Sequence, residues 1–229
     1  MSAAPKVGIV DYGVGNLFSV VEACKVAALE PTLVTSPDGL AASDGIILPG
    51  VGAFGTAVEH LQNLGLFSAL QEAARAGRPL LGICLGMQLL FDSSSEFGDH
   101  RGLGLIPGTV RELREMEPKD PRLKVPHIGW TPVTYRTPEA WPTENPALAA
   151  LFADIPDNTE YYFVHSFAAE PKEPSSVAAE SDYLGRRFCS VAHSKNVIGM
   201  QCHPERSGTL GLKVYRNWGE LLRRQKGLR

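Results

Sequence analysis

Short apolar runs alternate with amphipathic segments in the first part of the chain. Buried strands are predicted at Val7–Asp11, Thr32–Thr35, Gly45–Leu48 and Leu80–Ile83. Between them, apolar residues recur at helical spacing and predict helices over 17–29, over 54–76 with a break near Gly65, and over 86–91. Apolar strands that alternate with helices are typical of parallel sheets buried on both faces. The pattern therefore predicts an α/β fold with a mostly parallel central sheet flanked by helices.

The pattern changes in the second half of the chain. Residues 105–147 are rich in proline and charge. Antiparallel strands are predicted at 110–113, 133–135, 161–166 and 188–192, the last two with the spacing of a hairpin. A further apolar strand at 197–202 precedes a closing helix over 208–228. We therefore expect an additional antiparallel section in the C-terminal half, and we predict a single domain over 1–229 because no boundary is evident.

Composition narrows the class of protein. The chain has 229 residues with 44% hydrophobic and 21% charged content, which indicates an ordinary globular fold. The net charge of −3 and the absence of a basic stripe argue against a nucleic-acid partner. No apolar run is long enough for a membrane span, and the N-terminus leads directly into a strand without a signal peptide. Four cysteines without Cys-x-x-Cys spacing predict no metal site, no disulfide framework and a cytoplasmic location. No cofactor is predicted.

Cys84 is the strongest candidate for chemistry. It lies between a predicted strand and a predicted helix, with Gly82 and Gly86 two positions away on either side. A sharp strand-to-helix turn needs unusual backbone angles and little side-chain bulk, which glycines provide. Such a turn would raise the sulfur above the sheet edge, near a helix N-terminus that favours the thiolate. We interpret Cys84 as an activated nucleophile; the alternative is a buried core cysteine.

A cysteine nucleophile needs a base and a group that orients the base. His203 follows the last predicted strand, at the strand end where α/β sheets place their sites. Glu205 lies two residues further on, within reach of the imidazole along an extended segment. We predict that His203 is the base and Glu205 the orienting acid; the alternative is a surface turn of sequence His-Pro-Glu.

Acyl chemistry also needs hydrogen-bond donors for an oxyanion. The segment Pro49–Gly52 follows a buried strand, and its two glycines let backbone amides turn toward a substrate. The amide of Leu85, directly after the nucleophile, is the natural second donor. A plain strand-to-helix loop is the alternative for Pro49–Gly52 taken alone.

Taken together, the segments 82–88, 203–205 and 49–52 resemble the class I (triad-type) glutamine amidotransferases. The resemblance covers nearly the whole chain and implies the flavodoxin-like fold of that family. It also implies a triad of Cys84, His203 and Glu205, with oxyanion donors at Gly52 and Leu85. The glutamine contacts that it implies are Gly50, Gln88, Glu96, Ser166 and Phe167. Glu96 would bind the α-ammonium group, although a glutamate in such a charged loop is often merely solvated.

Four further stretches, 9–17, 126–130, 162–167 and 203–208, are similar to the glutaminase-subunit family of imidazole glycerol phosphate synthase. Pro-His-x-Gly-Trp at 126–130 is the most specific of them. This resemblance implies a glutaminase in histidine biosynthesis that passes ammonia to a (β/α)8-barrel cyclase in a heterodimer. The candidates for the docking face are Tyr12, Asn16, Trp130 and Arg206. Core packing is the alternative for Trp130.

The chain departs from that family's usual pattern at three positions. Thr131 stands where asparagine is usual, Phe167 where tyrosine is common, and Cys202 where phenylalanine is usual. We expect Cys202 to point away from His203 into the core. The alternative functions are a glutaminase subunit of another synthase, such as pyridoxal phosphate synthase, a stand-alone cysteine hydrolase, and a non-catalytic regulatory module.

Overall fold

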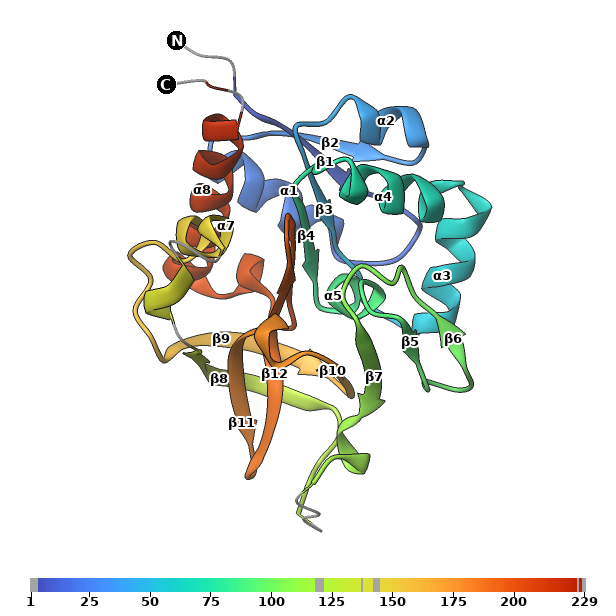
Figure 1. Cartoon of the computed structure of the whole chain (residues 1–229), viewed down its shortest axis with the longest axis vertical. Coiled ribbons are helices and arrows are strands. Elements are labelled where there is room, and N and C mark those ends of the chain that lie inside the picture. Colours follow the sequence, from blue (N-terminus) through green and yellow to red (C-terminus); the bar gives the residue numbers. More distant parts are fainter. Residues whose placement is uncertain (1–3, 118–121, 137, 142–144, 226, 228–229) are drawn as a thin grey trace.

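The computed structural model describes residues 4–117, 122–136, 138–141, 145–225 and 227. Within these ranges a nine-stranded sheet runs through the molecule in the order β2-β1-β3-β4-β13-β12-β11-β8-β9 (Figure 1). Its parallel part comprises β1 (Lys6–Val10), β2 (Glu30–Val34), β3 (Gly45–Leu48), β4 (Leu80–Ile83) and β13 (Val197–Met200). Its antiparallel part comprises β8 (His127–Tyr135), β9 (Thr159–His165), β11 (Val177–Tyr183) and β12 (Arg186–Ser194). The predicted α/β class and the additional antiparallel section are confirmed.

Helices cover both faces of the parallel part. In the described ranges the α-helices are α1 (Leu17–Val26), α2 (Pro37–Ala41), α3 (Phe54–Asn63), α4 (Leu66–Arg75), α5 (Leu85–Leu89), α7 (Pro146–Leu151) and α8 (Gly208–Gln225). Successive residues of β3 point to opposite faces: Ile47 packs in the cluster with α1, α7 and α8, whereas Ile46 and Leu48 pack in the cluster with α2, α3, α4 and α5. None of the helices in the described part of the chain is long and apolar enough to cross a membrane.

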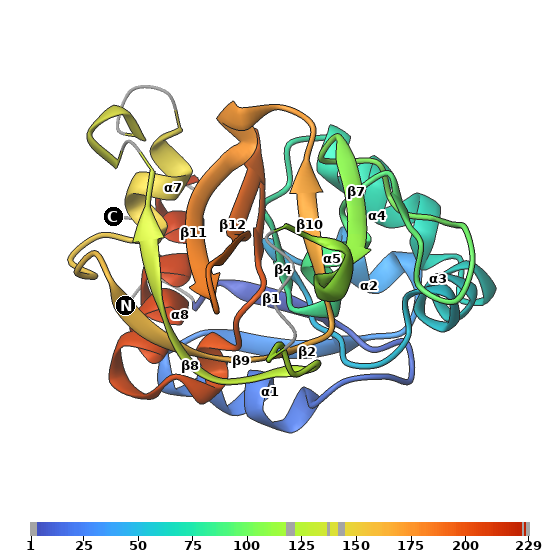
Figure 2. The ribbon, with the colours of Figure 1, turned by 90° about the horizontal axis from the view of Figure 1, so that it is seen from below.

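A second, four-stranded sheet lies beside the first. Its order is β10-β7-β5-β6, with β5 (Ser93–Ser94), β6 (His100–Arg101), β7 (Gly108–Glu112) and β10 (Phe167–Pro171). Figure 2 shows β7 and β10 side by side, and Val110 and Ala169 from these strands pack in one cluster with α5. Since only Ser166 separates β9 from β10, the chain passes directly from the large sheet into the small one at this residue.

Several strand pairings differ from the expectation. Residues 127–131, where no strand was predicted, form the first part of β8; His127 and Thr131 are buried there, while Ile128 and Trp130 are exposed. The two segments with hairpin-like spacing do not pair with each other: β9 pairs with β8, and β12 pairs with β11 and β13. The strand predicted at 110–113 corresponds to β7, which pairs with β10 and β5 in the small sheet rather than within the large one. Local patterns contain no information about which distant strand completes a ladder, so these pairings could not be predicted.

Helix boundaries agree better with the sequence pattern. The predicted break near Gly65 is confirmed, because this residue has φ +68° and separates α3 from α4. The first helix ends at Val26 rather than at 29, since Ala28 has a left-handed φ of 55°. Pro31 lies beyond the helix end, within the edge strand β2, where a missing backbone donor is tolerated.

The turn between β4 and α5 is packed so closely that it requires glycine. A Cβ atom on Gly86 would lie 1.7 Å from the carbonyl oxygen of Leu48, and one on Gly82 would lie 2.7 Å from the carbonyl oxygen of Gly86. Both obstacles are backbone atoms, which cannot rotate away. The close approach of α5 to the sheet therefore depends on these two glycines.

We expect Gly86→Ala to lower the free energy of unfolding by more than ~3 kcal/mol, because the new methyl group meets the backbone of β3. The matched control is Gly45→Ala, whose methyl group would meet only side-chain atoms, at the end of Leu222, with a shortest distance of 2.6 Å. Urea unfolding of both variants measures the difference. Equal losses in the two variants would contradict the role assigned to Gly86.

Candidate active site

Cys84 occupies the predicted turn between β4 and α5. Its φ of 55° and ψ of −112° lie outside the helical and extended regions, a strained conformation that is often found at functional sites. The Cys84 amide donates to the carbonyl of Met200 at 2.8 Å, which ties the turn to the end of β13. The side chain is only 5% exposed. The sulfur is thus held rigidly at the carboxyl end of the parallel strands.

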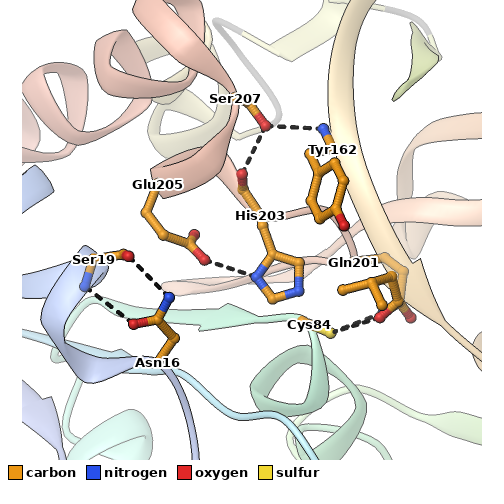
Figure 3. A network of polar contacts seen from close by, with 9 residues as sticks. Asn16, Ser19, Cys84, Tyr162, Gln201, His203, Glu205 and Ser207 are labelled. Atoms are coloured by element: carbon orange, nitrogen blue, oxygen red, sulfur yellow. Dashed lines mark hydrogen bonds and ion pairs between the residues drawn. The ribbon is translucent and has the colours of Figure 1, made fainter. Parts of the chain in front are cut away.

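His203 and Glu205 lie beside Cys84 (Figure 3). They follow Met200, the last residue of β13, by three and five positions. Nδ1 of His203 and Oε1 of Glu205 are 2.7 Å apart, and both side chains are nearly completely buried. The backbone around His203 is also held: its amide donates to the Tyr162 carbonyl at 2.9 Å, and its carbonyl accepts from the Ser207 hydroxyl at 2.6 Å. The structure therefore brings together the three residues predicted to form a triad.

The environment of His203 favours the protonated ring. Burial alone lowers the pKa of an imidazole, but the contacts with Cys84 and Glu205 outweigh it and raise the pKa of His203 to about 10. With Nδ1–H bonded to the carboxylate, the other nitrogen, Nε2, is buried and has no conventional hydrogen-bond partner among the described residues. Nε2 is the nitrogen available for proton exchange with the thiol or with a bound molecule.

A pocket of about 240 Å³ opens next to the sulfur. It is small and suits a molecule of about the size of an amino acid. Of the ten residues predicted for the triad, the oxyanion hole and glutamine binding, seven line this pocket, whereas Gly50, His203 and Glu205 do not. The lining residues are Val51, Gly52, Cys84, Leu85, Gln88, Glu96, Pro126, Val164, His165, Ser166 and Phe167.

Gln88 is oriented by its neighbours. Its Nε2 donates to the Phe167 carbonyl at 2.9 Å and to Oε1 of Gln201 at 3.1 Å. Both amide hydrogens are thereby used, which leaves Oε1 as the atom that can accept a hydrogen bond from a molecule in the pocket. Gln201, in turn, directs its Nε2 toward the Cys84 sulfur at 3.7 Å.

Sequence reasoning missed Gln201, although it is fully buried and contacts the nucleophile. The available signal was its position two residues before His203 at the end of an otherwise apolar strand, where a polar side chain must find a partner. Cys202, which follows it, is also fully buried and belongs to the core, as expected.

Glu96 is not simply solvated. Its Oε2 accepts a hydrogen bond from the Phe54 amide at 2.6 Å, at the start of α3, and its side chain lines the pocket. Partial burial raises its pKa, while the Phe54 amide and nearby His100 oppose that rise. A carboxylate fixed in this way in the pocket lining is suited to bind a cationic group.

The two predicted oxyanion donors, the amides at Gly52 and Leu85, have different surroundings. Gly52 lines the pocket with φ +124°, a conformation that favours glycine. The amide of Leu85, however, donates to the Gly50 carbonyl at 3.3 Å. An oxyanion bound by Leu85 therefore has to replace that carbonyl. Gly50 must itself be glycine, since a Cβ atom there would lie 2.2 Å from the hydroxyl oxygen of Tyr12.

One of the four predicted docking residues is misplaced. The Tyr12 side chain is 1% exposed and donates its hydroxyl to the Pro49 carbonyl at 2.7 Å, so its prediction as a surface contact is wrong. The Tyr12 ring follows the apolar strand β1 and packs in the core, and its hydroxyl helps to hold the segment Pro49–Gly52 in place. Asn16 is exposed and caps α1 by accepting from the Ser19 amide.

Trp130 and Arg206 do lie at the surface. Trp130 is 53% exposed, which excludes core packing. The guanidinium carbon of Arg206 lies 4.4 Å from the centre of the Tyr162 ring, and the Trp130 ring contacts the edge of the same tyrosine. Tyr162 also lies against the His203 ring, with 6.4 Å between ring centres. This surface group is therefore adjacent to the triad.

The chain resembles known proteins over almost all its length. The model of the family "Glutamine amidotransferase class-I" matches residues 9–219. The imidazole glycerol phosphate synthase subunit HisH of Moorella thermoacetica is 42% identical over 95% of this chain and 95% of the relative. HisH of Chlorobium luteolum is 41% identical over 93% of this chain and 98% of the relative.

Solved structures with low sequence identity share the fold. The Thermotoga maritima PurLQS structure aligns with a TM-score of 0.69 at 20% identity, over 96% of this chain and 99% of that one. The glutaminase domain of Trypanosoma brucei CTPS aligns with a TM-score of 0.67 at 16% identity, over 96% of this chain and 94% of that one. These matches confirm the predicted flavodoxin-like amidotransferase fold.

We expect Glu205→Gln to lower the pKa of His203, because the amide cannot stabilise the imidazolium charge. In the native fold the raised pKa stabilises the folded state fully below pH 6.5, and this contribution is lost as the pH rises toward about 10. Between pH 6.5 and about 10, the free energy of unfolding should therefore fall less in the variant than in the native chain. Urea titrations at several pH values and ring NMR of His203 measure both effects.

The matched control is Glu22→Gln, which breaks an exposed ion pair with Lys25 on α1 and should leave the His203 titration unchanged. An unaltered His203 pKa in Glu205→Gln would contradict the electrostatic coupling of this pair.

Proposed function

Because the chain belongs to the class I glutamine amidotransferases, and its relatives at 42% and 41% identity are HisH subunits, we propose that it is the glutaminase subunit of imidazole glycerol phosphate synthase. It hydrolyses glutamine to glutamate and ammonia for histidine biosynthesis. The ammonia is used by a cyclase subunit, a (β/α)8 barrel, that forms imidazole glycerol phosphate and aminoimidazole carboxamide ribotide. The four free cysteine thiols of the described residues support a cytoplasmic location.

The observation that carries this function is the buried His203–Glu205 pair beside Cys84, which itself lines a pocket that suits an amino acid. We likewise propose one domain over 1–229, since the large sheet contains strands from both ends of the chain. The pocket lining supplies the polar groups that glutamine requires: the Glu96 carboxylate for the α-ammonium group, and Gln88 and the backbone at Ser166 and Phe167 for the rest of the molecule.

The reaction follows from the positions of these groups. The Cys84 thiolate attacks the side-chain carboxamide carbon of glutamine and forms a tetrahedral intermediate. His203 gives its Nε2 proton to the departing nitrogen, so that ammonia leaves and a glutamyl thioester remains. His203 then takes a proton from water, whose oxygen attacks the thioester and releases glutamate and the thiol. Glu205 keeps Nδ1–H in place and stabilises the imidazolium.

The orientation of the Gly50 carbonyl limits the rate of this reaction. The amides at Gly52 and Leu85 hold the oxyanion, but the Leu85 amide is hydrogen-bonded to the Gly50 carbonyl. This carbonyl has to turn away before the donor is available. The glycines of the segment permit such a rotation, and an isolated subunit in the observed conformation is consequently a slow glutaminase.

The cyclase docks on the face that carries Trp130 and Arg206. Exposed apolar side chains at Ile128 and Trp130 lie on the outer face of β8, and Arg206 is stacked on Tyr162 next to them. Tryptophan and arginine are common anchors of protein interfaces. Asn16, exposed at the start of α1, belongs to the same proposed interface. Docking here puts the partner beside His203.

We expect Cys84→Ala to reduce glutamine-dependent synthesis by the complex more than about 1,000-fold, because no other group can form the thioester. Ammonia-driven synthesis by the same complex should be unchanged, since it bypasses the glutaminase. The control is Cys24→Ala, in a buried cysteine of α1 outside the pocket, which should retain both activities. Glutamine-dependent activity in Cys84→Ala would refute the assigned nucleophile.

Trp130→Ala should weaken binding of the cyclase about 30-fold, the effect of removing an interface anchor worth ~2 kcal/mol. Calorimetric titration with the cyclase measures this change. Leu33→Ala removes a side chain of similar exposure, 48%, from the edge strand β2 at the opposite end of the sheet order and should bind normally. If both variants bind as tightly as the native chain, the proposed interface is wrong.

A further inference from the structure

Two buried histidines on neighbouring strands form a hydrogen-bond chain that the triad does not use. His127 of β8 and His165 of β9 are opposite each other in the ladder, with His127 Nδ1 and His165 Nε2 3.1 Å apart. His165 Nδ1 is 2.8 Å from the Phe167 carbonyl, and His127 Nε2 is 2.9 Å from the Thr131 hydroxyl. The residues are at most 7% exposed, except Phe167, which is partly buried.

These contacts determine the protonation of both rings. A carbonyl only accepts, so His165 must donate its Nδ1–H to Phe167 and must accept at Nε2. His127 then donates from Nδ1 and accepts at Nε2, and the Thr131 hydroxyl is the donor that completes the chain. Each ring carries one proton, on Nδ1. Burial supports this neutral state because it lowers the pKa of His127 to about 4 and that of His165 to about 3.

The surroundings hold the rings in position. His127 stacks on Phe163 and on Tyr183, with 5.3 and 4.1 Å between ring centres. Phe188 packs against both histidines, 5.0 Å from His165 and 5.8 Å from His127. An aromatic cage of this kind leaves each imidazole little freedom to rotate, so the direction of its hydrogen bonds is maintained.

The hydrogen-bond chain ends at the residues that orient the side-chain amide of Gln88 in the pocket. The Phe167 carbonyl accepts from His165 and, with its second lone pair, from Gln88 Nε2 at 2.9 Å. Gln88 also donates to Gln201, whose Nε2 approaches the Cys84 sulfur. A continuous series of hydrogen bonds therefore leads from Thr131 to the nucleophile. Removing its first donor would leave an unsatisfied acceptor at His127 and permit ring tautomers that no longer hold the carbonyl.

The series begins on the strand that carries the proposed interface. Along β8, His127 and Thr131 face inward, whereas Ile128 and Trp130 between them face outward. A strand alternates its side chains between two faces, so any shift of this segment on docking also moves the start of the series. The two faces of one strand thus connect the docking surface with the pocket.

We propose that His127 and His165 are positioning residues for glutamine: with Thr131 as the donor, they hold the Phe167 carbonyl and hence the orientation of the Gln88 amide, and they link docking on β8 to the glutamine site. This proposal rests on the proposed function, since it assigns Gln88 to glutamine. Neither histidine touches the reacting atoms.

The test is Thr131→Val in the full-length complex with the cyclase, because valine keeps the shape and removes the hydroxyl. We expect the KM for glutamine to rise about five- to tenfold, the effect of a lost hydrogen bond in a binding site. The kcat should stay within about twofold, and ammonia-driven synthesis should be unchanged. Thr131→Ser, which restores the donor, should restore KM.

The matched control is Thr134→Val on the same strand. The Thr134 hydroxyl donates to Asn158 at 2.8 Å on the exposed side, away from the histidines. Nitrogen-15 NMR of the native chain provides a readout that does not depend on activity or on the folding of a variant. Both rings should show the Nδ1–H tautomer, which is the minor form of free histidine, and Thr131→Val should alter the signals of His127.

An Nε2–H tautomer for either histidine in the native chain would overturn the proposal, as would an unchanged KM in Thr131→Val. An equal rise of KM in Thr134→Val would show a general effect of altering β8 and would also overturn it. If the native complex has no glutamine-dependent activity, the proposed function fails and the link to glutamine fails with it. The NMR signals still decide separately whether the hydrogen-bond chain exists.

Discussion

The parallel pairing of β4 with β13 is the constraint on which the site depends. It puts Gly82 opposite Gly199, and both must lack a side chain because α5 lies directly on them. The same pairing ends with Met200 beside Ile83, so that Cys84 and the segment leading to His203 leave the sheet at the same edge. Catalytic groups from distant parts of the chain thereby meet without a flexible connection. Pre-positioning of this kind supplies a large share of catalytic power in enzymes generally.

A second consequence of this packing is a site with few adjustable parts. The His203 imidazole, the Glu205 carboxylate and the side chains of Gln88 and Gln201 are buried, and hydrogen bonds direct them toward particular partners. Low exposure strengthens each of these interactions and makes an unpaired group costly. The exception is the Gly50 carbonyl, which occupies the Leu85 donor. Flexibility is thus concentrated in a short glycine-containing segment, which is where a partner could control the reaction.

Strand β8 explains how a surface event could reach such a rigid pocket. Its outward side chains form the apolar part of the proposed interface, and its inward side chains begin the hydrogen bonds that end at Cys84. Thr131, where asparagine is usual in the subunit family, is compatible with this arrangement because its hydroxyl supplies the required donor. Because residues 105–147 are rich in proline, the sequence pattern did not predict that 127–131 form part of a strand with two distinct faces.

The sequence by itself determined the α/β class, the break at Gly65, the turn at Cys84 and the identity of the triad candidates, because each depends on local spacing, on glycine or on a recognisable motif. Only the tertiary structure decided the pairing of β8 with β9, the burial of Tyr12, and the meeting of His127 with His165. These depend on contacts between residues far apart in the chain, and burial changes the energy of a polar or aromatic group only after such contacts form. A pattern along the chain therefore predicted which residues could react, while packing determined how they are oriented and linked.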